Sequence, residues 1–262
     1  SMSYLFGSVK KSSEDEARDQ EKNRVESAAA MVTMRELCAE LLDPTKVVPA
    51  PAKPEHDEDG TDDDDMGDRA IIPAGKLEIP AESTLQRFLD GYNNDAHVAA
   101  KRLRRMLIWR ASYSYGLNDT LVRDINTSTP GIDLQIETGK CYILNTRDKC
   151  RRPIVVVHVR RHDPSKQSRD DITCFGVHIL ERAEGLLQPW PCDADSLDRN
   201  KTAQDYSSDK LCIIFNLEGI GMANVDMGAA KRIIYMLTNF YPERMGLCLL
   251  VAAPLLFSAA WA

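Results

Sequence analysis

The clearest pattern in the chain is an apolar run, an amphipathic stretch and a second apolar run towards its C-terminal end. The two runs cover 210–217 and 246–262. Between them, apolar residues recur at helical spacing. The members of this predicted helix face are Ala230, Ile233, Ile234, Leu237 and Phe240. Asn224 or Asp226 is suited to cap the helix start, and Pro242 ends the helix. Strand, crossover helix and strand form a βαβ unit, so the pattern predicts a parallel sheet.

The last apolar run has two interpretations. Its 17 residues carry no charge and are close to the lower length limit of a membrane-spanning helix, which is typical of a tail anchor. Pro254 in its middle disfavours a helix, and a buried parallel strand also reads as a continuous apolar run. The strand and helix before it favour the buried strand.

The rest of the chain predicts helices first and strands later. We expect helices over 12–42, 83–90, 95–112 and 171–187, and strands near 141–145 and 154–160. Asn94 is the expected cap of the third helix. The sequence thus predicts four parts. They are an N-terminal helical segment (1–48), an acidic disordered insert (49–75), a helical subdomain (76–128) and an α/β domain (129–262).

The net charge of −7 comes from one short segment. Glu55 to Asp68 contains nine acidic residues and no Lys or Arg, so taking nine negative charges from −7 leaves +2 for the remainder. A nearly neutral remainder lacks the basic footprint of a nucleic-acid-binding protein. The sequence therefore predicts no nucleic-acid partner.

The seven cysteines form no C-x-x-C motif and no zinc-like pairing. Cys174, Cys212 and Cys248 lie in apolar runs, where free cysteine is typically a small buried hydrophobe. The odd number, with no recognisable signal peptide, predicts a reducing compartment and a cytoplasmic protein.

Motifs for catalysis, metals or cofactors are absent or imperfect. There is no Gly-x-Ser-x-Gly, His-Glu-x-x-His or P-loop motif. The Asp62–Gly67 segment resembles a calcium loop, but Pro73 stands where the loop needs a glutamate. His158 and His162 have the spacing of a metal pair on a helix, yet they follow a strand pattern. We therefore expect no enzyme, no cofactor and no metal.

The C-terminal part resembles a known family. Four features resemble the CRAL-TRIO lipid-binding family, especially its phosphatidylinositol-transfer branch. They are the motif F-Y-P-E-R-M-G at 240–246, the apolar strand after it, Ala253-Pro254 and Phe257-Ser258. The similarity spans about 207–261, and 84–111 resembles the helical region before that domain. The resemblance implies an α/β fold with a mostly parallel sheet flanked by helices and an N-terminal helical subdomain.

The resemblance also implies a function. It implies non-enzymatic binding of a phosphoinositide or another hydrophobic lipid, with transfer between membranes and peripheral contact with a membrane surface. The headgroup is expected at the turn formed by Tyr241, Glu243 and Arg244. Side chains that alternate along the strands are expected to share one lipid-facing side of the sheet. These predicted pocket residues are Leu211, Ile213, Phe215, Leu249, Val251 and Val155.

Several positions depart from the family pattern. Leu211 and Ile213 replace a serine and a threonine that hold a choline headgroup, Val155 replaces a pocket tyrosine, and Tyr92-Asn93 replace a basic residue. The chain also ends shortly after Phe257-Ser258, where the family has a mobile gate helix. We therefore expect either a truncated chain or a lidless pocket that exposes apolar surface. A protein-interaction module that kept the fold and lost lipid exchange is the alternative function.

Two basic clusters bear on the membrane. One is on the predicted helix over 95–112, and the other surrounds the strand near 154–160. Their members are Lys101, Arg102, Arg104, Arg105 and Arg110, and then Arg147, Lys149, Arg151, Arg152, Arg160 and Arg161. Such clusters suit an anionic membrane surface, or they are solvated ends of helices and strands. The sequence predicts no oligomeric state.

Overall fold

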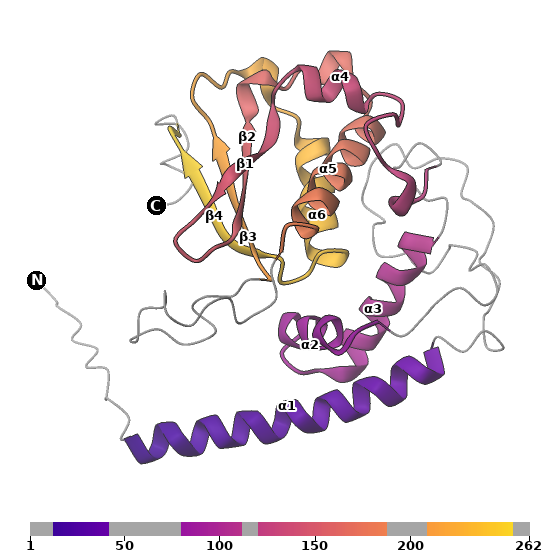
Figure 1. Cartoon of the computed structure of the whole chain (residues 1–262), viewed down its shortest axis with the longest axis vertical. Coiled ribbons are helices and arrows are strands. Elements are labelled where there is room, and N and C mark those ends of the chain that lie inside the picture. The colour runs from indigo at the N-terminus through magenta and orange to yellow at the C-terminus, as the bar shows by residue number, and fades with distance from the viewer. Residues whose placement is uncertain (1–12, 42–79, 112–119, 188–208, 254–262) are drawn as a thin grey trace, which may run out of the picture.

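The computed structural model describes residues 13–41, 80–111, 120–187 and 209–253 (Figure 1). The predicted acidic insert, the calcium-like segment and Phe257-Ser258 lie outside these residues. Nothing below bears on them.

The described chain folds into a helical part followed by an α/β part, as the sequence predicts. The helices are α1 (Ser13–Leu41), α2 (Glu82–Gly91), α3 (Ala96–Ala111), α4 (Ile132–Glu137), α5 (Arg169–Glu184) and α6 (Met227–Asn239). The strands are β1 (Cys141–Arg147), β2 (Pro153–His158), β3 (Leu211–Asn216) and β4 (Met245–Val251). The sheet has the order β1-β2-β3-β4; β1 is antiparallel to β2, and the other pairs are parallel. The predicted fold class is confirmed.

Helices α1, α2 and α3 pack together and form one core with the α/β part. Met31, Met34 and Cys38 of α1 are buried against α2 and α3. Trp109 of α3 stacks on Phe240 at the end of α6, with ring centroids 4.1 Å apart and planes within 6°. The helical part is therefore fixed to the α/β part by aromatic packing.

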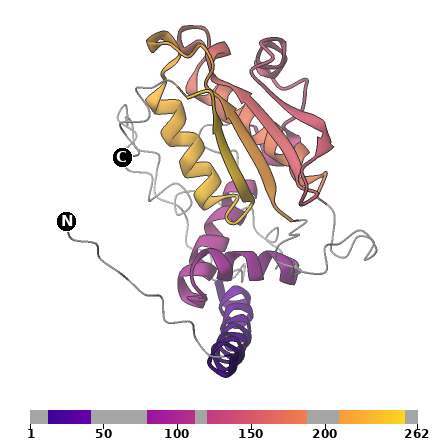
Figure 2. The ribbon, with the colours of Figure 1, turned by 90° about the vertical axis from the view of Figure 1, so that its left-hand side faces the viewer.

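The strand register divides the side chains of the sheet between two faces. Helices α5 and α6 lie on one side of the sheet in Figure 1. The side chains that face these helices include Val155, Leu211, Ile213 and Phe215. Figure 2 looks onto the opposite side, where no described helix crosses the strands. We call this side the open face. Register assigns to it Tyr142, Ile154, Val156, His158, Ile214, Asn216, Leu247, Leu249 and Val251.

Strand β4 confirms the prediction of a parallel strand but not that of a buried one. It is an edge strand, and Leu249, Leu250 and Val251 are 39, 46 and 38% exposed. Cys248 is also exposed, so the prediction that it is a buried hydrophobe is wrong, whereas Cys174 and Cys212 are buried as predicted. The difference arises because β4 is the edge strand of the described sheet and α5, which contacts β1 and β2, does not cover it.

The buried side of α6 agrees with the predicted face in part. Of the predicted members, Phe240 is buried and Ile233 and Leu237 pack against the core, whereas Ala230 and Ile234 are exposed. Ala229 and Met236, outside the predicted face, are also buried. Asp226 caps the helix by accepting a hydrogen bond from the Ala229 amide at 2.8 Å.

Helix α3 is capped differently from the prediction. Asp95, not Asn94, accepts hydrogen bonds from the amides of His97 and Val98, both at 3.1 Å. Asn94 instead takes a left-handed backbone conformation, with φ of 62°. It therefore belongs to the turn before the cap.

The Asp226 cap allows a first prediction. Burial opposes the charge of this carboxylate, but hydrogen bonds from the Ala229 amide and His162 outweigh that effect and hold its pKa below the ordinary value. Because the folded-state pKa is lowered, this stabilisation is present at neutral pH and is lost as the pH falls below about 4. We expect Asp226→Ala to reduce the free energy of unfolding at pH 7 by about 1 kcal/mol. Urea denaturation at pH 7 and pH 3 checks this, and an equal loss at both pH values would contradict it.

Candidate functional site

The candidate site is the turn at 241–246, which joins α6 to β4 and faces the helical part. Arg244 of the turn bonds to Glu184 of α5 through Nε, and its Nη1 donates to the Asp209 carbonyl at 2.9 Å. Arg87 of α2 donates to the Pro242 carbonyl at 3.2 Å. The turn is therefore held by side chains from both parts of the molecule.

Two glutamates on α5 link this turn to α3. Arg110 of α3 binds Glu181 through two hydrogen bonds, at 2.7 and 3.1 Å, and lies 3.8 Å from Glu184. Burial opposes the charge of Arg110, but the hydrogen bond to Glu181 and the attraction of Tyr241, Glu181 and Glu184 together outweigh burial and raise the Arg110 pKa. Glu184 also pairs with Arg244. We call Arg110, Glu181, Glu184 and Arg244 the carboxylate clamp.

Tyr241 is bound to this clamp. Its side chain is 1% exposed, and its hydroxyl donates to Glu181 Oε1 at 2.7 Å. Burial and the neighbouring Glu181 raise the Tyr241 pKa well above its ordinary value. The ring is packed edge-on against Trp109 in the core, so in this structure Tyr241 is turned away from the surface where a headgroup is predicted to bind.

Arg87 is a buried cation close to the same turn. Its side chain is 8% exposed. Burial, followed by repulsion from Arg244, lowers its pKa to about 10. The Arg87 guanidinium therefore remains charged at neutral pH and adds to the positive potential behind the turn.

Glu243 is the accessible member of the turn. Its backbone φ is 57°, a left-handed conformation that costs a residue with a Cβ about 1–2 kcal/mol. Its carboxylate lies 2.9 Å from Lys210 Nζ, just before β3. Strain at an exposed charged residue suggests that its position serves binding. Glu243 and Lys210 together offer an acceptor and a cation beside the turn.

Gly246 allows the start of β4 to lie close to Lys210. A methyl group at this position would lie 2.8 Å from Lys210 Cβ and 2.9 Å from Arg152 Nη1. Only glycine lets the chain pass between these two basic side chains. Lys210 is not among the predicted site residues, although its position just before β3 places it at the same end of the sheet as the turn.

The structure does not unite the six predicted pocket residues. Leu211, Ile213, Phe215 and Val155 face the helices, whereas Leu249 and Val251 are on the open face. The prediction of one shared face is wrong because Leu249 pairs with Ile214, and Val251 with Asn216. The three positions that replace polar headgroup residues, Leu211, Ile213 and Val155, are all buried in the core.

Comparison with known proteins identifies the α/β part. Residues 136–262 match the family described as the CRAL/TRIO domain. This part of the chain is a CRAL-TRIO domain.

Individual relatives agree with this. The CRAL-TRIO domain-containing protein C3H8.02 of Schizosaccharomyces pombe is 24% identical over 69% of this chain and 36% of its own length. Phosphatidylinositol transfer protein CSR1 of Eremothecium gossypii is 28% identical over 69% of this chain and 38% of its own length. The chain thus spans little more than a third of these relatives. The crystal structure of Sfh5 matches with a TM-score of 0.47 and 13% identity, covering 71% of this chain and 62% of that one.

The basic residues of α3 mostly serve the fold of the CRAL-TRIO domain and its helical part. Arg102 donates to Asn239 at 3.0 Å, Arg105 is buried, and Arg110 belongs to the carboxylate clamp. Of the two alternatives for this cluster, a membrane surface or a solvated helix face, neither describes these three residues, because they contact other parts of the fold.

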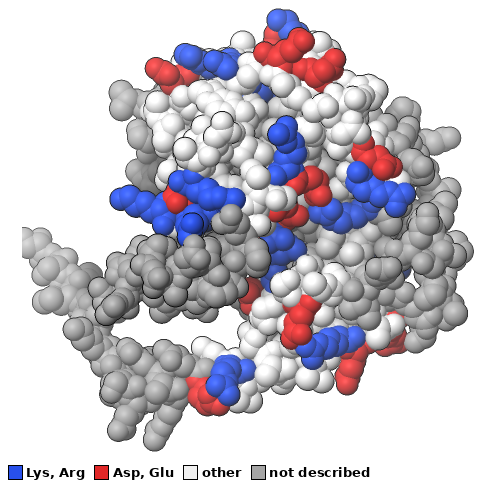
Figure 3. All heavy atoms as spheres, in the orientation of Figure 1, with Lys and Arg blue, Asp and Glu red and all other residues white. Residues whose placement is uncertain are grey.

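The second cluster is more exposed. Figure 3 shows Lys and Arg side chains gathered beside the sheet, where the β1–β2 hairpin lies in Figure 1. Arg147 of this hairpin donates to the carbonyls of Arg151 and Leu186, whereas Arg152 pairs with Asp148 at 2.7 Å. Lys149 is exposed. The hairpin therefore keeps a positive surface near Lys210.

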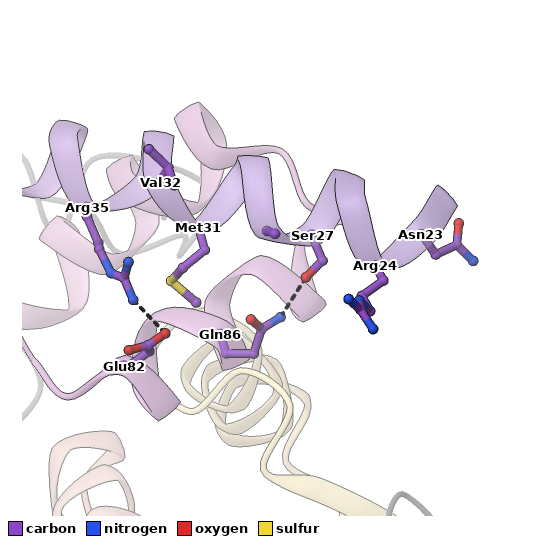
Figure 4. A pocket seen from close by; sticks show the side chains of 9 residues that line it. Asn23, Arg24, Ser27, Met31, Val32, Arg35, Glu82 and Gln86 are labelled. Carbon is purple, nitrogen blue, oxygen red and sulfur yellow. Dashed lines mark hydrogen bonds and ion pairs between the residues drawn. The ribbon is translucent and has the colours of Figure 1, made fainter. Parts of the chain in front are cut away.

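A separate groove of about 770 Å³ lies between α1 and α2 (Figure 4). Its polar side chains pair across it. Arg35 bonds Glu82 at 2.6 Å, and Gln86 donates to Ser27 at 3.4 Å. The groove is polar, open and distant from the sheet, so it does not extend the lipid site.

Metal and membrane-spanning sites can be checked for the described residues. In these ranges no group of three or more His, Cys, Asp or Glu side chains is placed to bind a metal ion. No helix within the same ranges is long and apolar enough to cross a membrane. His158 and His162 bond to different partners, Tyr142 and Asp226.

The carboxylate clamp allows a second prediction. Glu181→Gln removes the charge that Arg110 and Tyr241 both bind. A hydrogen bond to a charged group contributes about 1.5–3 kcal/mol, so we expect the free energy of unfolding to fall by about 2 kcal/mol. The matched control is Glu137→Gln at the exposed end of α4, which should change it by less than about 0.5 kcal/mol. Guanidinium denaturation of both variants checks this, and equal effects would contradict the role of the clamp.

Proposed function

We propose that this chain binds a hydrophobic lipid reversibly on the open face of its CRAL-TRIO domain and carries it between membranes without covalent chemistry. The observation that carries the proposal is an apolar face of the sheet that no described helix covers. Its members Ile154, Val156, Ile214, Leu249 and Val251 carry no charge. Leu249 and Val251 are exposed, whereas Val156 and its neighbour Cys212 on the same face are buried. Phosphatidylinositol transfer protein CSR1 is among the relatives, which supports a lipid ligand.

The energetics favour a lipid on such a face. Each buried CH₂ group contributes about 0.8 kcal/mol, so an acyl chain gains several kcal/mol by leaving water for this surface. The opposite side of the sheet offers no comparable space, because Val155, Leu211 and Ile213 are buried against the helices. The acyl chains are therefore assigned to the open face.

The finer proposal is that the lipid is a phosphoinositide whose headgroup lies at the Glu243 turn. Lys210 supplies a cation for the phosphate, and Glu243 supplies an acceptor for inositol hydroxyls. Arg244 is already occupied by Glu184 and the Asp209 carbonyl, so it holds the turn in place. This assigns recognition to Glu243 and Lys210, with Arg244 in support.

Peripheral membrane contact would use the β1–β2 hairpin, which lies at the same end of the sheet as the Glu243 turn. Each basic side chain near an anionic surface contributes roughly 1 kcal/mol. Lys149 and Arg147 of the β1–β2 hairpin lie at the end of the sheet where the Glu243 turn also begins β4. Docking through this hairpin would bring the turn and the open face near the bilayer. The six described cysteines are free, which supports a cytoplasmic location.

A second candidate function is a protein-interaction module, which the edge of the sheet favours. Strand β4 is exposed on both faces and is the last strand of the described sheet. Such an edge can accept a strand from a partner. The two functions differ in whether a lipid or a protein partner occupies the apolar surface. A measurement of lipid binding therefore distinguishes them.

A charge on the open face tests lipid binding. We expect Leu249→Lys to weaken binding at least tenfold, because a lysine amine opposes burial of apolar surface. The control is Ile234→Lys on the exposed side of α6, which should bind normally. Native mass spectrometry of protein purified from cells, and lipid transfer between vesicles, measure the effect. A wild-type protein that carries no lipid and transfers none would favour the interaction module.

A second pair of variants tests the headgroup. We expect Glu243→Gly and Lys210→Ala each to weaken phosphatidylinositol binding about tenfold and leave phosphatidylcholine binding unchanged. Glu243→Gly relieves the left-handed strain while losing an exposed ion pair, so the free energy of unfolding should stay within about 1 kcal/mol. Lys231→Ala, on the exposed side of α6, is the control. Unchanged phosphatidylinositol binding in both variants would refute the headgroup site.

A further inference from the structure

Three polar side chains form a hydrogen-bonded row on the otherwise apolar open face. Tyr142 comes from β1, His158 ends β2 and Asn216 ends β3. The Tyr142 hydroxyl lies 3.1 Å from His158 Nε2, and Asn216 Nδ2 lies 3.3 Å from His158 Nδ1. Register explains the row, because Tyr142 pairs with Val156, two residues from His158 on the same face, and His158 pairs with Asn216.

The direction of the hydrogen bonds in this row is fixed from one end. Asn216 Oδ1 accepts a hydrogen bond from the Glu218 amide at 2.9 Å. The Asn216 amide nitrogen therefore faces His158, and it donates to Nδ1. A neutral imidazole whose Nδ1 accepts carries its hydrogen on Nε2. His158 Nε2 then donates to the Tyr142 oxygen, so the row does not use the hydroxyl hydrogen of Tyr142.

The surroundings of this hydroxyl define what it can bind. Tyr142 is 39% exposed. Its neighbours on the open face, Val156 and Ile214, are apolar. The nearest cations in sequence to Tyr142 and His158 are engaged elsewhere. Lys140 donates to Gln167, Arg160 lies 4.0 Å from Glu218, and Arg161 donates to the Gly139 carbonyl. The Tyr142 hydroxyl is thus an oriented hydrogen-bond donor beside apolar surface, with no cation assigned to it. Such a donor suits an uncharged acceptor.

We infer that the Tyr142 hydroxyl donates a hydrogen bond to an uncharged carbonyl oxygen of the bound lipid, such as an acyl ester. His158 and Asn216 are positioning residues that direct the hydroxyl hydrogen towards the ligand. This inference rests on the proposed lipid-binding function and adds a determinant of specificity to it. The row is at the carboxyl ends of β2 and β3, whereas Glu243 precedes β4 at the other end of the sheet. An ester carbonyl at Tyr142 therefore belongs to a lipid whose headgroup is not at the Glu243 turn, and the inference rests on the open face rather than on the headgroup site.

Matched lipids test the inference on the full chain. A diacylglycerol has ester carbonyls, and its dialkyl ether analogue lacks them while keeping the same length and apolar surface. We expect the wild-type protein to bind the ester about tenfold more tightly, the effect of one hydrogen bond in an apolar site. Tyr142→Phe should lose this preference and keep its affinity for the ether. Tyr92→Phe, at the end of α2, is the control and should retain the preference.

The outcomes separate this inference from the proposed function. Equal binding of ester and ether by the wild-type protein would overturn the Tyr142 site and leave lipid binding intact. Binding of neither lipid, nor of phosphatidylinositol, would overturn both. Loss of ether affinity in Tyr142→Phe would mean that the hydroxyl only supports the fold. A tenfold loss by Tyr142→Phe for a dialkyl phosphatidic acid would assign the hydroxyl to a phosphate and overturn the uncharged acceptor.

A second measurement requires no ligand. Long-range ¹H–¹⁵N correlation spectra distinguish the two neutral tautomers of an imidazole. At pH 8 we expect the ring hydrogen of His158 on Nε2. If the hydrogen is on Nδ1, Nε2 must accept a hydrogen bond from the Tyr142 hydroxyl. The hydroxyl is then not available to a ligand, and the inference is overturned.

Discussion

The arrangement of the molecule depends on two carboxylates one helical turn apart on α5. Glu181 and Glu184 are bound from one side by Arg110 of α3 and from the other by Arg244 of the turn before β4. Removing partly buried charges from water is costly, and the cost is offset only when each oxygen is hydrogen-bonded. This requirement fixes three separate segments against one another. It places the helical part, the crossover helix and the start of the edge strand in one rigid arrangement.

The clamp explains why the Glu-Arg turn combines structural and binding roles. Tyr241 and Arg244 are directed inwards and satisfy Glu181 and Glu184, so they are not free for a ligand. Glu243 lies between them in an uncommon left-handed conformation and is turned towards Lys210 and solvent. Neighbouring residues in one turn thus divide the two tasks. The strain at Glu243 persists because the inward residues on both sides hold the backbone.

Much of the fold could be predicted from the sequence, whereas the composition of each sheet face could not. Helix and strand positions follow from apolar periodicity, as the close agreement of α1 and β3 with prediction shows. The sequence groups Leu249 and Val251 with Leu211 and Ile213 on one face, because alternation within one strand does not reveal its register with the next. A shift of one residue moves a side chain to the other side of the sheet. For the same reason the sequence alone does not single out Tyr142. Its role becomes visible only when the pairing of β1 with β2 places it beside His158. Exposure of Cys248 depends on where the covering helices end, which no local pattern encodes.

The two faces of the sheet therefore have different physical requirements. The helix-facing side is filled by its own side chains, and small changes there disturb packing. The open face is apolar in its middle, with Lys210 and Glu243 beyond one end and the Tyr142 row at the other. Lys210, just before β3, and Asn216, at its end, are six residue steps apart, so about 20 Å separates the two ends. The ester carbonyls of a glycerophospholipid lie only a few bonds from its phosphate, so one phospholipid cannot reach both ends at once. The Glu243 turn and the Tyr142 row are therefore alternative anchoring points for a lipid on the same apolar face. The polar groups at the two ends of the sheet, more than the area of its apolar surface, are what would distinguish a lipid from other hydrophobic molecules.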